Sequence, residues 1–184
     1  MLKQIESTLI KEEFQCSIIQ ATEENPEDHL LVFLGLDAKE REQLLIITAK
    51  QQEVEKKDLP AVSEPTDFFI VQFYYTFPFL VKEIATSQVS GFTLFINQMV
   101  DFPGFEFNEL ENRLYYRYVW ITKTSGFDPQ LIMSIIGIIS LFLELFSATF
   151  ERLAENEITF NQLLEEMVHL AENSPDVDTD KDIS

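Results

Sequence analysis

The stretch FEFNELENRLYYRYVWITKTSGFDPQLIMSIIGIISLFLELFSATF, residues 105–150, decides the fold class of this chain. Its first part predicts a hairpin. FEFNE begins a short strand, Glu111-Asn112 makes a turn, and apolar and aromatic side chains alternate through residues 113–121. Asp128-Pro129 then supplies an N-cap and a proline at the first helical position, so a long helix is expected from there to about residue 155. An antiparallel hairpin followed by a long helix is the unit from which the remaining chain can be placed.

Outward from this unit, groups of strands alternate with helices. Three apolar, β-rich runs are expected to be strands, at residues 29–37, 43–52 and 67–77, and residues 14–19 allow a further short strand. Helical spacing of apolar side chains predicts further helices at residues 2–14, 79–100 and 159–172. Short connections favour antiparallel neighbours. We therefore predict an α+β domain, an antiparallel sheet with helices packed on it, in the order α-β-β-β-α-β-β-α-α.

The chain is expected to form one domain with a polar end. It has 184 residues, 46% of them hydrophobic, which is enough for one sizeable core. We assign residues 1–173 to a single α+β domain and residues 174–184, with four aspartates, to an acidic disordered tail. Residues 53–66 contain Pro60 and Pro65 and are expected to be a surface loop or an extended arm.

Net charge restricts the classes of partner. Thirty-two acidic residues oppose thirteen basic ones, which gives a net charge of −19. Nucleic-acid binding relies on a basic stripe, and docking on an anionic membrane relies on clustered Lys and Arg, so neither partner is expected. The first residues lack the apolar run of a secretory signal, and the single cysteine, Cys16, cannot form an internal disulfide. These features predict a cytoplasmic protein.

Residues 131–150 are long enough to cross a membrane, because twenty helical residues span about 30 Å. However, the segment carries Glu144 and several hydroxyl side chains, and a carboxylate deep in lipid costs about 2.5 to 3.5 kcal/mol. We therefore expect a buried helix of a soluble protein at this position.

Residues 103–153, PGFEFNELENRLYYRYVWITKTSGFDPQLIMSIIGIISLFLELFSATFERL, resemble the YbjN family and the wider type III secretion chaperone-like fold. The similar features are a helix, a polar turn, a strand with basic and aromatic residues, a glycine-containing loop and a long helix after Asp-Pro. The order of elements over about residues 1–155 is similar too, whereas the loop at 53–66 and the extra helix after residue 158 depart from the pattern. The resemblance implies a small acidic α+β protein with a chaperone-like or regulatory role and no catalytic residues.

Residue patterns for catalysis, metals or cofactors are weak. Cys16 has no neighbouring His, Lys or Arg in the sequence to activate it, and His29 and His169 are far apart in the chain. The alternating aspartates of the tail lack the glycine and closing glutamate of a calcium loop, and five scattered glycines make no phosphate cradle. We therefore predict a non-enzymatic protein without a catalytic, metal or cofactor site.

Apolar side chains occupy two faces of the long predicted helix. One face suits packing on the sheet, and the second requires another cover. Two covers remain open: the C-terminal helix of the same chain, or a partner protein or second copy of the chain in a homodimer. We predict that an apolar surface of the sheet and the long helix binds this partner, with Ile138, Leu141, Leu145, Tyr115 and Arg117 as the binding residues.

Two alternatives to a protein-binding module remain. One is a small-ligand-binding protein or an enzyme, with a pocket between sheet and helices lined by Tyr116, Tyr118 and Trp120. The other is an acidic protein that mimics a polyanion, which requires carboxylates gathered on one concave face. A deep pocket with a convergent acid or histidine would favour the first alternative.

Overall fold

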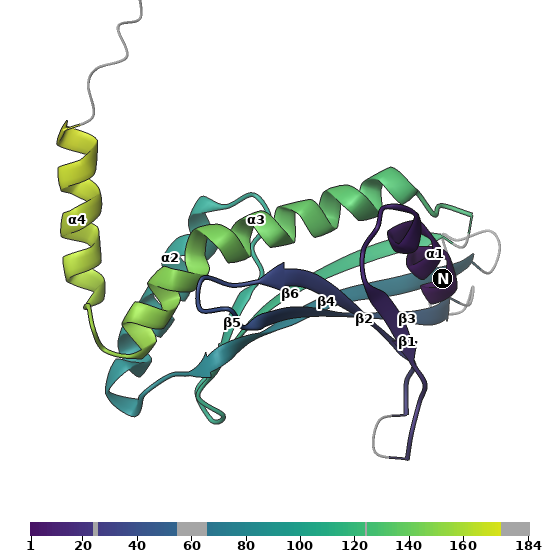
Figure 1. Ribbon diagram of the computed structural model, residues 1–184, viewed down its shortest axis with the longest axis horizontal. Helices are drawn as coiled ribbons and strands as arrows, with labels where there is room; N and C mark the ends of the chain where they lie inside the picture. The colour runs from purple at the N-terminus through teal and green to yellow at the C-terminus, as the bar shows by residue number, and fades with distance from the viewer. Residues whose placement is uncertain (24–25, 55–65, 124, 174–184) are drawn as a thin grey trace, which may run out of the picture.

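The computed structural model describes residues 1–23, 26–54, 66–123 and 125–173 (Figure 1). These residues form an α+β fold with a six-stranded antiparallel sheet in the order β1-β2-β3-β4-β6-β5. The elements are α1 (Leu2–Lys11), β1 (Cys16–Ile19), β2 (His29–Leu36), β3 (Glu42–Val54), β4 (Thr66–Leu80), the 3₁₀ turn η1 (Glu83–Ala85), α2 (Thr86–Met99), β5 (Phe105–Asn108), β6 (Arg113–Lys123), α3 (Pro129–Ala154) and α4 (Phe160–Asn173).

The predicted fold class is confirmed, and the predicted order needs one correction. Four strands precede α2 rather than three, because the short run at Cys16–Ile19 pairs with β2 as an edge strand. The expected helix at 79–100 begins only at Thr86, because β4 continues through Pro78 to Leu80. Pro78 has no N–H to donate, and it lies where the register between β4 and β6 is irregular. The predicted tail, 174–184, and most of the loop at 53–66 lie outside the described residues.

One face of the sheet forms the core. Registered neighbours across five strands point to the same side: Val32, Leu45, Tyr75, Tyr116 and Phe105. All five are at most 2% exposed. Helices α1, α2 and α3 lie on this side of the sheet, and no helix of the described residues lies on the other side (Figure 1). The molecule therefore has a helical layer, a core and a sheet whose second face is open.

Helix α3 runs along the core for 26 residues. The predicted cap is confirmed: the Asp128 carboxylate accepts hydrogen bonds from the backbone N–H groups of Gln130 and Leu131, at 2.9 and 3.3 Å. Helix α3 also has the length and hydropathy of a membrane span, a property that it shares with core helices of soluble proteins. Its buried positions follow helical spacing and include Ile132, Ile135, Ile136, Ile139, Leu143, Phe150 and Leu153.

Helix α4 projects from the end of α3 (Figure 1). Its first turn has the predicted capping box, in which the Gln162 N–H donates to Thr159 Oγ1 at 3.2 Å and the Thr159 N–H donates to Gln162 Oε1 at 2.9 Å. Phe160 packs edge-on against Phe92 and Phe95 of α2, with ring centroids 6.1 and 5.6 Å apart. Only the first turns of α4 are thus anchored on the body of the fold.

Candidate functional site

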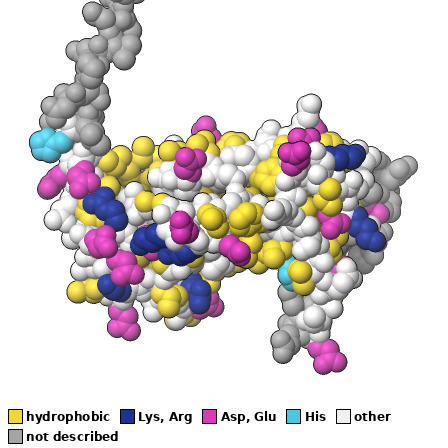
Figure 2. Space-filling view, viewed as in Figure 1, with side chains coloured by type: hydrophobic (Ala, Val, Ile, Leu, Met, Phe, Trp, Pro, Cys, Tyr) yellow, Lys and Arg dark blue, Asp and Glu magenta, His cyan; other side chains and the backbone are white. Residues whose placement is uncertain are grey.

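The outer face of α3 carries apolar side chains that the fold leaves open to solvent. We call Ile138, Leu141, Leu145 and Ala148 the α3 stripe; they fall at steps of three or four residues. Leu141, Leu145 and Ala148 are exposed on the outer side of the helix, and Ile138 is half-buried at the edge of the side that faces the sheet. Leu141 and Leu145 are 49% and 57% exposed. Hydrophobic side chains reach the surface along α3 in Figure 2, with charged side chains around them. The stripe is therefore a line of apolar side chains at the surface of α3.

Helix α4 does not cover the α3 stripe within the described residues. The cover that α4 provides lies over α2, where Phe160 contacts Phe92 and Phe95 and the Phe160 N–H donates to Gln88 Oε1 at 2.8 Å. The stripe stays open although α4 is present. The sequence allowed two alternatives for covering this face, the C-terminal helix of the same chain or another protein chain. In this structure the C-terminal helix does not cover it.

Tyr115 and Arg117 lie on the other side of the molecule. Tyr116 points into the core, so its two neighbours on β6 point out of the open sheet face. There the Tyr115 ring stacks on Tyr74 with centroids 5.0 Å apart, and Arg117 Nε donates to Glu106 Oε1 at 2.8 Å. The predicted partner-binding residues therefore form two separate surfaces rather than one.

The open sheet face is itself partly apolar. In an antiparallel sheet with one solvated face, residues along each strand usually alternate between apolar ones that face the core and polar ones that face solvent. Here the outward positions of the central strands include Leu31, Leu44, Ile46, Ile70, Val119 and Ile121, and Ile121 is 64% exposed. In the sequence, this feature is visible as apolar residues at both odd and even positions along the strands.

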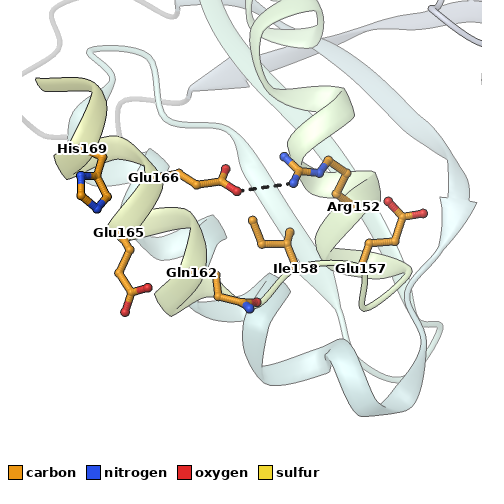
Figure 3. Close-up of a pocket in the computed structure, with 7 residues that line it drawn as sticks. All are labelled: Arg152, Glu157, Ile158, Gln162, Glu165, Glu166 and His169. Carbon is orange, nitrogen blue, oxygen red and sulfur yellow. Dashed lines mark ion pairs between the residues drawn. The ribbon is translucent and has the colours of Figure 1, made fainter. Parts of the chain in front are cut away.

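An open groove of about 680 Å³ separates the end of α3 from α4 (Figure 3). Ile158 is 4% exposed and lies at its base, while Arg152 and Glu166 face each other across it at 3.7 Å. Glu157, Gln162, Glu165 and His169 also line it. Three carboxylates against two basic side chains make this groove acidic. Arg152 comes one turn after Ala148 on the same face of α3, so the groove continues the α3 stripe.

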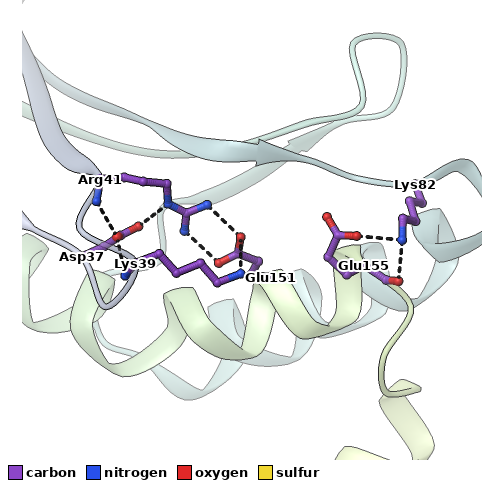
Figure 4. A network of polar contacts seen from close by, with 6 residues as sticks. All are labelled: Asp37, Lys39, Arg41, Lys82, Glu151 and Glu155. Carbon is purple, nitrogen blue, oxygen red and sulfur yellow. Dashed lines mark hydrogen bonds and ion pairs between the residues drawn. The ribbon is translucent and has the colours of Figure 1, made fainter.

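A network of ion pairs fixes the turn between β2 and β3 to α3 (Figure 4). Arg41 donates to both oxygens of Glu151, each at 2.8 Å, and to Asp37 Oδ2 at 2.7 Å. Lys39 Nζ lies 3.0 Å from Glu151 Oε1. Hydrogen bonding to Arg41 lowers the pKa of Glu151, and the backbone and side chain of Arg41 lower the pKa of Asp37 despite its burial. These cations are therefore engaged within the chain.

The predicted ligand pocket between the sheet and α3 has almost no volume. A cavity lined by Tyr116, Tyr118 and Ile138 measures about 10 Å³, and Trp120 is not part of its lining. Such a volume holds about one water molecule. The Tyr116 hydroxyl donates to the Phe102 carbonyl at 3.0 Å, and burial raises the pKa of Tyr116 to about 12. The ring packing therefore fills the space that a small ligand would need.

Cys16 is half-buried on the edge strand, and burial raises the pKa of its thiol. A raised pKa reduces the fraction of reactive thiolate. In the described part of the chain, no three His, Cys, Asp or Glu side chains are placed to hold a metal ion.

Comparison with known families and with curated proteins gives no match to this chain. The assignment of a role therefore depends on the surfaces described above.

Proposed function

We propose that the chain is a non-enzymatic, cytoplasmic protein-binding module, chaperone-like or regulatory, that docks another polypeptide on the α3 stripe. The observation that supports it is the exposure of Leu141 and Leu145 on a helix whose opposite face is already packed on the sheet. Contiguous exposed apolar patches commonly mark interaction sites. The resemblance of residues 103–153 to the YbjN and secretion chaperone-like pattern favours the same role.

Energetics support a docking role for these two leucines. Fully burying a leucine side chain is worth about 1.5 to 3 kcal/mol, and both are roughly half-open, so a partner gains a substantial part of that for each. The intrachain cover that the sequence allowed, α4, is anchored on α2 instead. The open sheet face, on the opposite side, offers a second surface of mixed apolar and polar character.

The test is Leu141→Asp, with Leu94→Asp as the matched control. Leu94 is a leucine on helix α2 that is 66% exposed, so the control makes the same substitution on a helix surface away from the stripe. Circular dichroism checks that both variants fold. Size-exclusion chromatography with light scattering, and crosslinking followed by co-purification from the native cell, then compare them with the wild type.

The expected result is that Leu141→Asp loses a crosslinked partner, or a dimer mass, that the wild type and Leu94→Asp retain. A folded Leu141→Asp protein with unchanged mass and unchanged partners would remove the α3 stripe as a docking surface, and the proposed function with it.

A further inference from the structure

We propose that the α3 stripe and the acidic groove beside α4 together receive a basic amphipathic helix from a partner protein. This inference deepens the proposed function and rests on it. It specifies the partner by shape, one helix with a leucine-rich face, and by charge, with Lys or Arg along the edges of that face.

The width of the surface indicates a single helix. From Ile138 to Ala148 the stripe follows one line along α3 for about 15 Å, at 1.5 Å per residue. It is one side chain wide, because Glu144 and Ser134 lie on the same outer side and the core begins on the other. A line of apolar side chains at steps of three and four is the seam that a second helix packs against, whereas a sheet or globular surface needs a broad face.

Charge complementarity indicates that this helix is basic. The cations nearest to the stripe are already paired: Lys39 and Arg41 with Glu151, and Arg152 with Glu166. Glu144 beside the stripe and Glu157 and Glu165 in the groove have no ion pair with any residue in the described part of the chain, and Glu144 and Glu165 are exposed. The surface around the apolar line is therefore negative, as is the whole chain, at −19.

The α3 stripe and the groove are continuous, so the proposed partner helix has a defined position along α3 as well as a defined binding face. Arg152 lies past Ala148 on the same side of α3 and forms one wall of the groove, and α4 forms the other (Figure 3). A helix lying on Leu141 and Leu145 and extending toward the α3 C-terminus enters this groove. Basic side chains at that end meet Glu157 and Glu165, and an apolar one reaches Ile158.

A second copy of this chain is a poorer occupant on the same grounds. Its projecting amphipathic helix, α4, carries Glu165 and Glu166, so exchange of α4 between copies would bring acidic side chains to an acidic groove. Each copy also contributes the same net charge of −19. Like charges facing each other across an interface oppose association.

The probe is a fluorescein-labelled synthetic peptide of about 18 residues, or five helical turns, with leucine at i, i+3, i+4 and i+7 positions and Lys or Arg elsewhere. Its twin keeps every leucine and replaces each basic residue with glutamate. Fluorescence anisotropy measures the affinity of both for wild type, Leu141→Asp, Leu94→Asp and the double variant Glu157→Gln/Glu165→Gln, at low and high salt.

We expect the basic peptide to bind the wild type at least about tenfold more tightly than its acidic twin, a difference of about 1.4 kcal/mol. Leu141→Asp should weaken binding of the basic peptide about tenfold or more, although the substitution adds a negative charge that would strengthen purely electrostatic binding. The double glutamine variant should weaken it about two- to fivefold and reduce its salt dependence, as expected for exposed charges. Leu94→Asp should leave the affinity unchanged.

Each remaining outcome overturns the inference in a distinguishable way. Equal binding of the two peptides, both lost in Leu141→Asp, refutes the basic partner and leaves the docking function intact. Equal binding of the basic peptide to wild type and Leu141→Asp shows non-specific attraction and refutes the site. A wild-type dimer that Leu141→Asp converts to a monomer identifies a second copy as the occupant. Unchanged mass and native partners in Leu141→Asp refute the proposed function as well.

Discussion

Gly137 provides a sharp test, because nothing within this chain explains a glycine there. It lies in the middle of α3, one turn before Leu141, and a Cβ built on it would meet no atom within 4 Å. Its φ is not among the positive values found in the chain, so ordinary helical backbone is all that it adopts. Glycine inside a helix costs about 1 kcal/mol relative to alanine. Gly137→Ala should therefore stabilise the isolated protein by about 1 kcal/mol and raise its Tm by about 2 to 4 °C.

The same variant should weaken docking. A glycine on an exposed helix face lets a second backbone approach closely, and an added methyl group in a packed contact costs about 1 to 3 kcal/mol. The basic peptide should then bind Gly137→Ala about five- to 150-fold more weakly than it binds the wild type. Stability and binding thus change in opposite directions, which general damage to the fold would not produce.

Thermal unfolding followed by circular dichroism and peptide titration by anisotropy measure the two effects. Gly91→Ala on α2 is the matched control: its Cβ would lie 3.2 Å from Cδ1 of Phe160, so the methyl group has to displace a packed ring. We expect a smaller gain in Tm from Gly91→Ala than from Gly137→Ala, because the added methyl group pushes on Phe160. A lower Tm for Gly137→Ala in the partner-free protein would show that its face is already packed in solution and would refute the reasoning.

Three further outcomes are expected. Glu151→Gln should lower the free energy of unfolding by about 1.5 kcal/mol in urea at neutral pH, the lower end for a charge-assisted bond because Arg41 is partly exposed. Because the fold lowers the pKa of Glu151, this contribution is present above its unfolded pKa and disappears as pH falls through the folded one, so wild type and variant should converge in acid. Gly104→Ala should cost about 1 to 3 kcal/mol in the same assay, because its Cβ would lie 2.6 Å from the Arg117 carbonyl oxygen, and an unchanged midpoint would contradict that contact. Cys16 should react with a thiol reagent more slowly in the folded protein than in urea, and equal rates would show that its raised pKa and partial burial do not protect it.

Local capping chemistry in the sequence predicted where α3 and α4 begin. Asp128-Pro129 placed the start of α3, and Thr159 with Gln162 placed the start of α4, because caps are made by side chains two or three residues away. The predicted fold class follows for the same reason: strand and helix periodicities are local, and short connections restrict strands to antiparallel pairing.

Features that depend on tertiary contacts were not predictable in this way. The sequence predicts a helix from residue 79, yet β4 continues through Pro78 to Leu80, where its ladder with β6 is irregular. Arg41 and Glu151 are 110 residues apart, so no spacing pattern signals their pair. The alternation of side chains along a strand predicts that Tyr115 and Arg117 share one face of β6. It does not predict which face, and only the burial of Tyr116 shows that the two residues lie on the side opposite the helices.

The composition of α3 becomes understandable once its two faces are considered separately. One face supplies the isoleucines, leucines and phenylalanine that pack over the sheet and contribute to the hydropathy that makes the helix resemble a membrane span. The α3 stripe also contributes to this hydropathy. On the stripe, a lipid-facing helix would have no use for Glu144, and a solvent-facing one would have no use for Leu141 and Leu145. A surface that combines apolar side chains with a carboxylate suits a protein partner, whose own leucines can cover the former and whose basic residues can reach the latter.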